Sequence, residues 1–165
     1  ILPISFDEIK EASKMNIATR LSALNFLDNG GAIGVFPGGT VSTAQSPFGV
    51  PMDPGWRSFT AKMITRSDAQ VVPIFFEGHN SRLFQVASHI HYNLRMGLLI
   101  KEFKSKVGNP VKIAIGNPLS DTAIKSRSGN PRILMDFLRE ETYKLSRTPL
   151  DNFNYGYEFE SRYKI

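Results

Sequence analysis

The chain has 165 residues, of which 41% are hydrophobic, 21% are charged and none is cysteine. This length suits one globular domain with its own core, and the lack of cysteine excludes disulfides, Cys-ligated metals and a thiol nucleophile. The net charge is +5, and residues 82–112 carry six of the 20 Lys and Arg but only one of the 15 Asp and Glu. This central segment therefore accounts for the whole excess of positive charge.

The hydrophobic pattern predicts helices and strands in alternation. Apolar residues recur at helical spacing early in the chain, where Ser5 and Glu8 form a capping box and Asn29-Gly30-Gly31 ends the run. Two short runs, 32–36 and 71–76, are apolar on both faces, as buried strands are. In chain order the predicted elements are a helix over 5–27, a strand at 32–36, a helix at 56–66, a strand at 71–76, helices at 81–88 and 94–106, a strand at 111–115 and a helix at 131–145.

Strands that alternate with helices are typical of an α/β fold. We therefore expect one layered α/β domain over residues 1–165, with a mixed, largely parallel sheet flanked by helices. Residues 148–165 form an aromatic-rich tail, whose alternating pattern at 153–159 indicates an added strand, an interface segment or a loosely packed terminus. The Gly/Pro-rich stretch 37–55 is long for a connection in a compact domain, and such stretches tend to be functional or disordered.

The segment Phe36-Pro37-Gly38-Gly39-Thr40-Val41-Ser42 directly follows the first predicted strand. Adjacent glycines let a ligand approach the backbone closely, and backbone amides with the hydroxyls of Thr40 and Ser42 could hold an anion such as phosphate. An ordinary Gly-Gly turn at the end of a strand has the same local pattern. Local spacing alone leaves a ligand site and a structural turn open.

Together with two later blocks, this segment resembles the glycerolipid acyltransferase family. Residues 36–42 are similar to the family's Phe-Pro-Glu-Gly-Thr-Arg-Ser block, and Val-Val-Pro-Ile at 71–74 is similar to its final, proline-bearing strand. Residues 76–85 resemble a branch of hemolysin-like proteins and lysophospholipid acyltransferases. The resemblance extends over about residues 1–119 and implies a fold like that of glycerol-3-phosphate acyltransferases, of which this chain would be the C-terminal part.

The resemblance implies transfer of a fatty acyl group from acyl-CoA or acyl-carrier protein to a hydroxyl of a lysophospholipid or a glycerol-phosphate-like acceptor in phospholipid biosynthesis. The acyl thioester would be a co-substrate, no cofactor would be bound, and the protein would work in the cytoplasm at the inner face of the membrane. The substrate-binding residues would be Pro37, Gly38, Gly39, Thr40, Ser42, Pro73, Glu77, Asn80 and Arg82. For the last three, a polar loop that caps the next helix is the alternative.

Two charged positions of the family block are uncharged in this chain. The family's Glu is Gly38 and its Arg is Val41, and a guanidinium binds phosphate through paired hydrogen bonds that Val cannot make. We therefore expect an acceptor other than an ordinary glycerol phosphate. The same two changes support an alternative function, a non-catalytic lipid- or membrane-binding module derived from this fold.

The family's catalytic pair, a His followed after four residues by an Asp, is absent from this sequence. None of His79, His89 and His91 has an Asp five residues further on. In the family the imidazole takes the proton from the acceptor hydroxyl, the carboxylate orients the imidazole, and the pair precedes the Phe-Pro block. We expect no catalytic residue in this chain and a His–Asp pair upstream of Ile1. We also expect no metal site, because the histidine spacing fits no usual zinc pattern.

The basic segment 82–112 interleaves cations with apolar residues in a predicted helix. Such a helix suits the surface of an anionic bilayer, and we expect Arg95, Lys101 and Lys104 to contact a membrane or phosphate. A core-packed helix with a solvated basic face has the same pattern. Nucleic acid is not an expected partner, because no known binding motif accompanies the charge.

Overall fold

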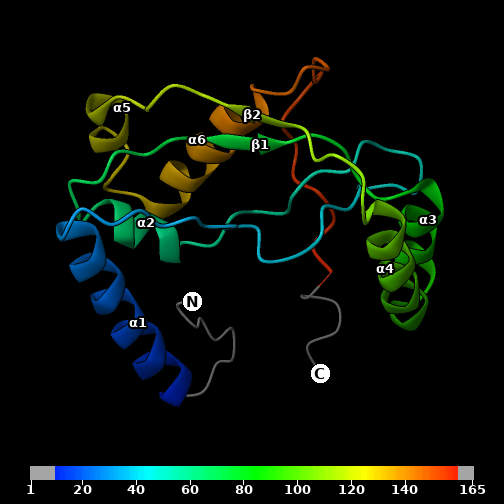
Figure 1. Cartoon of the computed structure of the whole chain (residues 1–165), viewed down its shortest axis with the longest axis horizontal. Coiled ribbons are helices and arrows are strands. Elements are labelled where there is room, and N and C mark those ends of the chain that lie inside the picture. The colour runs from blue at the N-terminus through cyan, green and yellow to red at the C-terminus, as the bar shows by residue number, and fades with distance from the viewer. Residues whose placement is uncertain (1–9, 160–165) are drawn as a thin grey trace.

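The structure, a computed structural model, describes the backbone of residues 10–159 and the side chains from Ile17 onward. Figure 1 shows α6 behind two short strands, a helical hairpin of α3 and α4 at one end of the molecule, and α1 extending away at the other end. In the described part of the chain the elements are α1 Lys10–Asp28, α2 Phe59–Ile64, β1 Ile74–Phe76, α3 Arg82–Ile90, α4 Tyr92–Lys106, β2 Ile113–Ile115, α5 Asp121–Lys125 and α6 Pro131–Tyr143.

The prediction of a largely parallel sheet is wrong. The sheet in the described residues has two strands, β1 and β2, and they pair antiparallel with Ile74 opposite Ile115 and Phe76 opposite Ile113. The connection explains the direction, because α3 carries the chain away from the end of β1 and α4 returns it to that same end (Figure 1). A parallel pair needs a crossover that returns the chain to the opposite end of the first strand.

The predicted strand at 32–36 is not formed. The Phe36 ring lies 5.6 Å from that of Phe76 in β1, yet residues 32–36 have no assigned strand structure. A strand requires a hydrogen-bonded neighbour, and no described strand pairs with this segment. The prediction of a buried strand is therefore wrong in both respects, because no strand forms here and none of residues 32–36 is buried, with Phe36 77% exposed.

The predicted helices are confirmed, with ends shifted by several residues. Ser81 precedes α3 and accepts a hydrogen bond from the Phe84 N–H, and Asn130 precedes α6, which begins at Pro131. The short helix α5 was not predicted, because five residues are too few to show a helical period. The proposed capping box near the start of the chain lies outside the described residues. No helix in the described ranges combines the length and the apolar character needed to cross a membrane.

The hydrophobic core lies between α2, α5 and α6. Its central residues, each at most 8% exposed, are Ala61, Ile124, Leu134, Met135 and Leu138. Three of them recur along one face of α6, as expected for an amphipathic helix packed on neighbours. Burying one such large side chain contributes roughly 2 kcal/mol, so this cluster fixes α6 against α2 and α5.

The long loop 37–55 is ordered by contacts with the C-terminal tail. Thr43 and Met52 form an isolated antiparallel bridge within the loop, and the tail residue Tyr157 donates its N–H to the Thr43 carbonyl at 2.9 Å. A Cβ on Gly156 would lie 1.8 Å from the Met52 carbonyl oxygen, so only glycine fits there. The tail thus packs along the loop, although its described residues form no strand.

Candidate functional site

A cavity of about 1100 Å³ brings the candidate segments together. Its walls come from residues 30–42, from α2, from residues 67–80 and from α6, which are far apart in the sequence. Most of the lining is apolar, with polar groups confined to a few places. This is the composition typical of a binding site for a largely apolar ligand.

The Gly38-Gly39 turn forms part of the cavity wall. Gly39 has a φ of +66°, a left-handed conformation that favours glycine. Gly38 is buried, and a Cβ there would lie 3.4 Å from the carboxylate of Asp53. A glutamate at position 38 would therefore place a second negative charge beside the carboxylate of Asp53. With glycine at this position, Asp53 is the acidic residue next to the turn.

Asp53 is the centre of a hydrogen-bonded cluster on the cavity wall. Its carboxylate accepts from the hydroxyl of Ser42 and, at 3.0 Å, from Nε1 of Trp56, and its N–H donates to the Tyr143 hydroxyl at 2.8 Å. Burial and then the charge of Asp53 raise the pKa of Tyr143 to about 12, so its phenol is neutral at neutral pH. The cluster fixes the loop on α6 and places hydroxyl groups beside the apolar wall.

A second polar part of the wall carries a cation. Lys106 lines the cavity and donates from Nζ to Oδ1 of Asn80, and Nδ1 of His79 contacts the Asn80 carbonyl oxygen at 2.9 Å. Among the described lining residues Lys106 is the only Lys or Arg. An ammonium group beside open space can bind a phosphate or a carboxylate as a point charge.

The structure separates the predicted substrate-binding residues into two groups. Glu77 and Arg82 do not line the cavity: Glu77 accepts from the N–H of Arg147 at 3.0 Å, and Arg82 donates to the Gly49 carbonyl at 2.6 Å. Both side chains therefore hold neighbouring loops. The others line the cavity: Pro37, Gly38, Gly39, Thr40, Ser42, Pro73 and Asn80.

The three predicted membrane- or phosphate-contacting residues are also separated. Arg95 is only 4% exposed, and its guanidinium donates to Oγ1 of Thr43 at 2.8 Å and to Oγ of Ser88 at 2.7 Å. Contrary to the prediction, Arg95 cannot contact a surface, because it ties the long loop to the α3–α4 hairpin. Lys101 and Lys104 are exposed on α4.

Among the lining residues that sequence reasoning did not assign to the site are Asp53, Trp56, Lys106 and Tyr143. Asp53 and Trp56 stand in or beside the Gly/Pro-rich loop, and an acidic residue there is a weak signal that could have been used. Lys106 and Tyr143 each end a helix, where their residue types are ordinary. Only the packing of the helices brings them to the cavity.

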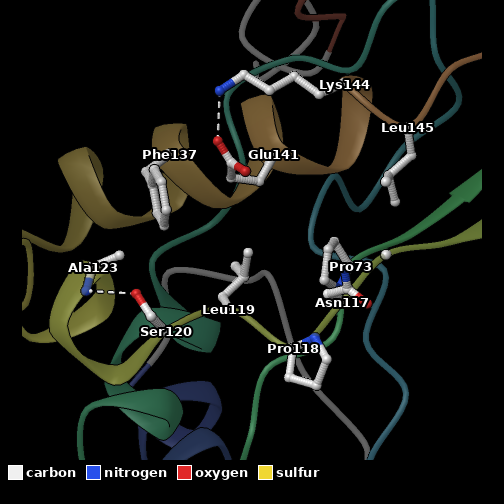
Figure 2. Close-up of a pocket in the computed structure, with 11 residues that line it drawn as sticks. Pro73, Asn117, Pro118, Leu119, Ser120, Ala123, Phe137, Glu141, Lys144 and Leu145 are labelled. Atoms are coloured by element: carbon white, nitrogen blue, oxygen red, sulfur yellow. Dashed lines mark hydrogen bonds and ion pairs between the residues drawn. The ribbon is translucent and has the colours of Figure 1, made fainter.

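A second, open hollow of about 370 Å³ shares Pro73 and Leu119 with the large cavity. Lys144 is paired with Glu141 at its rim, with Nζ 2.6 Å from Oε1, and Ser120 accepts a hydrogen bond from the N–H of Ala123. Figure 2 shows both pairs. These polar groups are engaged with one another, so we assign no ligand to this hollow.

The histidines are engaged with backbone groups. His89 Nε2 contacts the Ala44 carbonyl oxygen at 2.9 Å, and His91 Nδ1 accepts from the N–H of Asn93 at 3.1 Å. In the part of the chain that the structure describes, no group of three or more His, Cys, Asp or Glu is placed to hold a metal ion. The candidate site is therefore the cavity itself.

Comparison with known proteins gives a family match over most of the chain. A protein-family model described as Acyltransferase matches residues 7–152. No curated protein and no solved structure matches the chain significantly. The matched span contains all of the cavity-lining residues.

Proposed function

The chain belongs to an acyltransferase family, and from this premise we propose that it transfers a fatty acyl group from acyl-CoA or acyl-carrier protein to a hydroxyl of a lysophospholipid or glycerol-phosphate-like acceptor in phospholipid biosynthesis. The acceptor oxygen bonds to the thioester carbonyl carbon, the C–S bond breaks, and the hydroxyl proton passes to the released thiol. The observation that carries the proposal is the cavity, which joins an apolar wall, a hydroxyl-rich cluster and one cation in a single space.

The apolar wall suits a fatty acyl chain. Ile33 and Val35 line it from the extended segment, and Ile64 and Leu138 line it from α2 and α6. Each buried methylene contributes roughly 0.8 kcal/mol, so such a wall selects a long chain without needing directed contacts. Cavity depth then limits the chain length that fits.

The anionic part of a substrate belongs at the Lys106 end. Gly38 and Val41 carry no charge, and the carboxylate of Asp53 disfavours a phosphate on that wall. Lys106 with Asn80 offers a donor pair to an anion, whereas Ser42 and Tyr143 suit neutral hydroxyls. This division supports an acceptor other than an ordinary glycerol phosphate.

We assign the role of general base to no residue of this chain. Each histidine contacts a backbone group in the described structure. The resemblance to glycerolipid acyltransferases implies that the proton-accepting His–Asp pair lies upstream of Ile1. The residues described here bind and orient the two substrates and shelter the thioester from water.

Narrowing the cavity tests the proposal. Gly34 lines it, and a Cβ there meets no atom within 4 Å, so a Gly34→Trp variant fills space without a clash at the backbone. Loss of about two buried methylenes corresponds to roughly a tenfold slower transfer of long acyl chains, and short chains should be affected less. The measurement is the rate of labelled phospholipid formation by the whole protein from thioesters of graded length.

The matched control is Gly129→Trp, because Gly129 also has open space for a Cβ and lies outside the cavity. Equal rates for the two variants at every chain length would contradict binding of the acyl chain in this cavity. Binding of lysophospholipid without transfer from any thioester would instead support the non-catalytic lipid-binding module.

A further inference from the structure

The helix α4 buries polar side chains and exposes apolar ones. Arg95 and Glu102 are 4% and 8% exposed, whereas Met96, Ile100 and Phe103 are 42%, 63% and 72% exposed. The three apolar residues are spaced by four and three positions, so they form one stripe along the helix. A surface helix of a globular protein normally has the reverse arrangement.

Hydrogen bonds hold the helix in this orientation. Glu102 accepts from the N–H of Ser81 at 3.0 Å and from its hydroxyl, which anchors α4 to the start of α3. Seven residues before Glu102, Arg95 donates to Thr43 and to Ser88. Rotating α4 to bury its apolar stripe would break these bonds and leave charged groups without partners, which is costly. These hydrogen bonds therefore keep the apolar stripe facing outward.

The charges beside the stripe are all positive. Lys101 and Lys104 are exposed on α4, and the only carboxylate in residues 82–112 is that of Glu102, which is buried against Ser81. Exposed apolar side chains continue on α3, where Leu83 is 55% and Ile90 67% exposed. The hairpin thus combines an apolar surface with cations and shows no exposed acidic group.

We propose that the α3–α4 hairpin docks on an anionic lipid surface. The docking stripe, Met96, Ile100 and Phe103, enters the boundary between headgroups and acyl chains, and Lys101 and Lys104 contact lipid phosphates. The charge selects this occupant, because a second copy of the hairpin would bring like charges together whereas an anionic bilayer complements them. The proposal goes beyond acyl transfer and does not depend on it, because docking is measured without a thioester.

Vesicle binding by the whole protein tests the docking stripe. We expect cosedimentation with vesicles of phosphatidylcholine and phosphatidylglycerol, much weaker cosedimentation with phosphatidylcholine alone, and loss of binding at high salt, where charges are screened within about 3 Å. Ile100→Gln with Phe103→Gln should weaken binding at least about tenfold. The control Ile133→Gln changes an apolar residue on α6 that is also exposed, at 53%, and should leave binding unchanged.

The cationic contribution has its own matched pair. Each lysine near an anionic surface contributes about fivefold in binding, so Lys101→Gln with Lys104→Gln should weaken it roughly 25-fold. Lys62→Gln with Lys125→Gln removes the same charge from exposed positions on α2 and α5. This control pair should weaken vesicle binding much less. Equal losses in the two pairs, or binding that ignores the Ile100 and Phe103 changes, would overturn the proposal.

Insertion and self-association are distinguished by two further measurements. In a Phe103→Trp variant, the fluorescence added to that of Trp56 should be quenched by lipids with brominated acyl chains, and absence of quenching would overturn insertion. A concentration-dependent dimer mass in light scattering, abolished by Phe103→Gln, would show that a second copy covers the stripe and would likewise overturn lipid docking. Retained transfer to a water-soluble acceptor in Phe103→Gln would separate docking from the proposed activity.

Discussion

The helices α6 and α4 have similar lengths, but α6 buries mainly apolar side chains together with Arg139, whereas the buried residues of α4 are both charged. α6 packs Leu134 and Leu138 into the core, at 0% and 4% exposure, whereas α4 turns Arg95 and Glu102 inward and leaves Phe103 at 72%. Apolar burial is non-directional and supplies stability, whereas buried charges supply orientation and little net stability. The apolar face of α6 therefore stabilises the fold, whereas hydrogen bonds orient α4 so that its apolar face stays exposed to solvent.

The two helices should differ most in how much the free energy of unfolding falls when an apolar side chain is truncated. Leu134→Ala should lower the free energy of unfolding by about 3 kcal/mol, because it leaves a cavity in a packed core. Phe103→Ala should change it by less than about 0.5 kcal/mol, because the ring is exposed to solvent. Urea unfolding of the two variants measures both values, and a large loss for Phe103→Ala would show that α4 also stabilises the fold through its apolar face.

Removal of the buried cation should have the next largest effect. Arg95→Met leaves the carbonyl of Val41 and the hydroxyls of Thr43 and Ser88 without their charged donor. This change should lower the free energy of unfolding by about 2 kcal/mol. Arg95→Lys should recover only part of the lost stability, because an ammonium group cannot reproduce the hydrogen bonds of the planar guanidinium. Unfolding experiments test the stability, and hydrogen exchange at the amides of residues 41–44 should quicken. Unchanged exchange in Arg95→Met would contradict the role of Arg95 in fixing the loop.

Removal of the buried carboxylate of α4 should have a smaller effect than removal of the buried cation, and this effect should depend on pH. Burial alone would raise the pKa of Glu102, but hydrogen bonds from Ser81 and the charges of Lys106 and Lys101 lower it below its ordinary value. A lowered carboxyl pKa stabilises the folded state above the ordinary pKa of about 4.3, and this contribution is lost as the pH falls through the folded-state pKa. Glu102→Gln removes the charged acceptor of the two hydrogen bonds from Ser81, and this loss should lower the free energy of unfolding by about 1 kcal/mol at neutral pH.

The measurement for Glu102→Gln is urea unfolding from neutral pH into the acid range. The difference in the free energy of unfolding between the original protein and the variant should shrink as the pH falls, because the original protein loses the stabilising contribution of the Glu102 carboxylate. A constant difference across this range would show that the cost of the substitution comes from shape and packing rather than from charge.

The sequence predicted the helices better than the sheet. Spacing, caps and Pro131 are local signals, and each points to a helix that the structure contains. Strand pairing is not local: residues 71–76 and 111–115 each predict a strand, but their relative direction depends on how the hairpin between them returns the chain. The segment 32–36 shows the same limit, because nothing in its own residues reveals whether a partner strand is present.

The cavity was also predicted only in part. Residues 36–42, Pro73 and Asn80 were grouped through a resemblance, and the structure places Pro73, Asn80 and all of that segment on one cavity. Lys106 and Tyr143 could not be added, because each is an unremarkable residue at the end of a helix. Their role in the wall arises from helix packing, which no local pattern records.

The sequence by itself determined the positions of the helices, the concentration of positive charge in residues 82–112 and the resemblance that the family match agrees with at the level of an acyltransferase. Only the tertiary structure decided the antiparallel pairing, the walls of the cavity and the burial of Arg95 beside exposed Lys101 and Lys104. The physical reason is that helix formation depends on neighbours within a few residues, whereas burial depends on which distant groups supply hydrogen bonds or apolar contacts. The same basic helix can therefore face the core or a lipid surface until its partners are known.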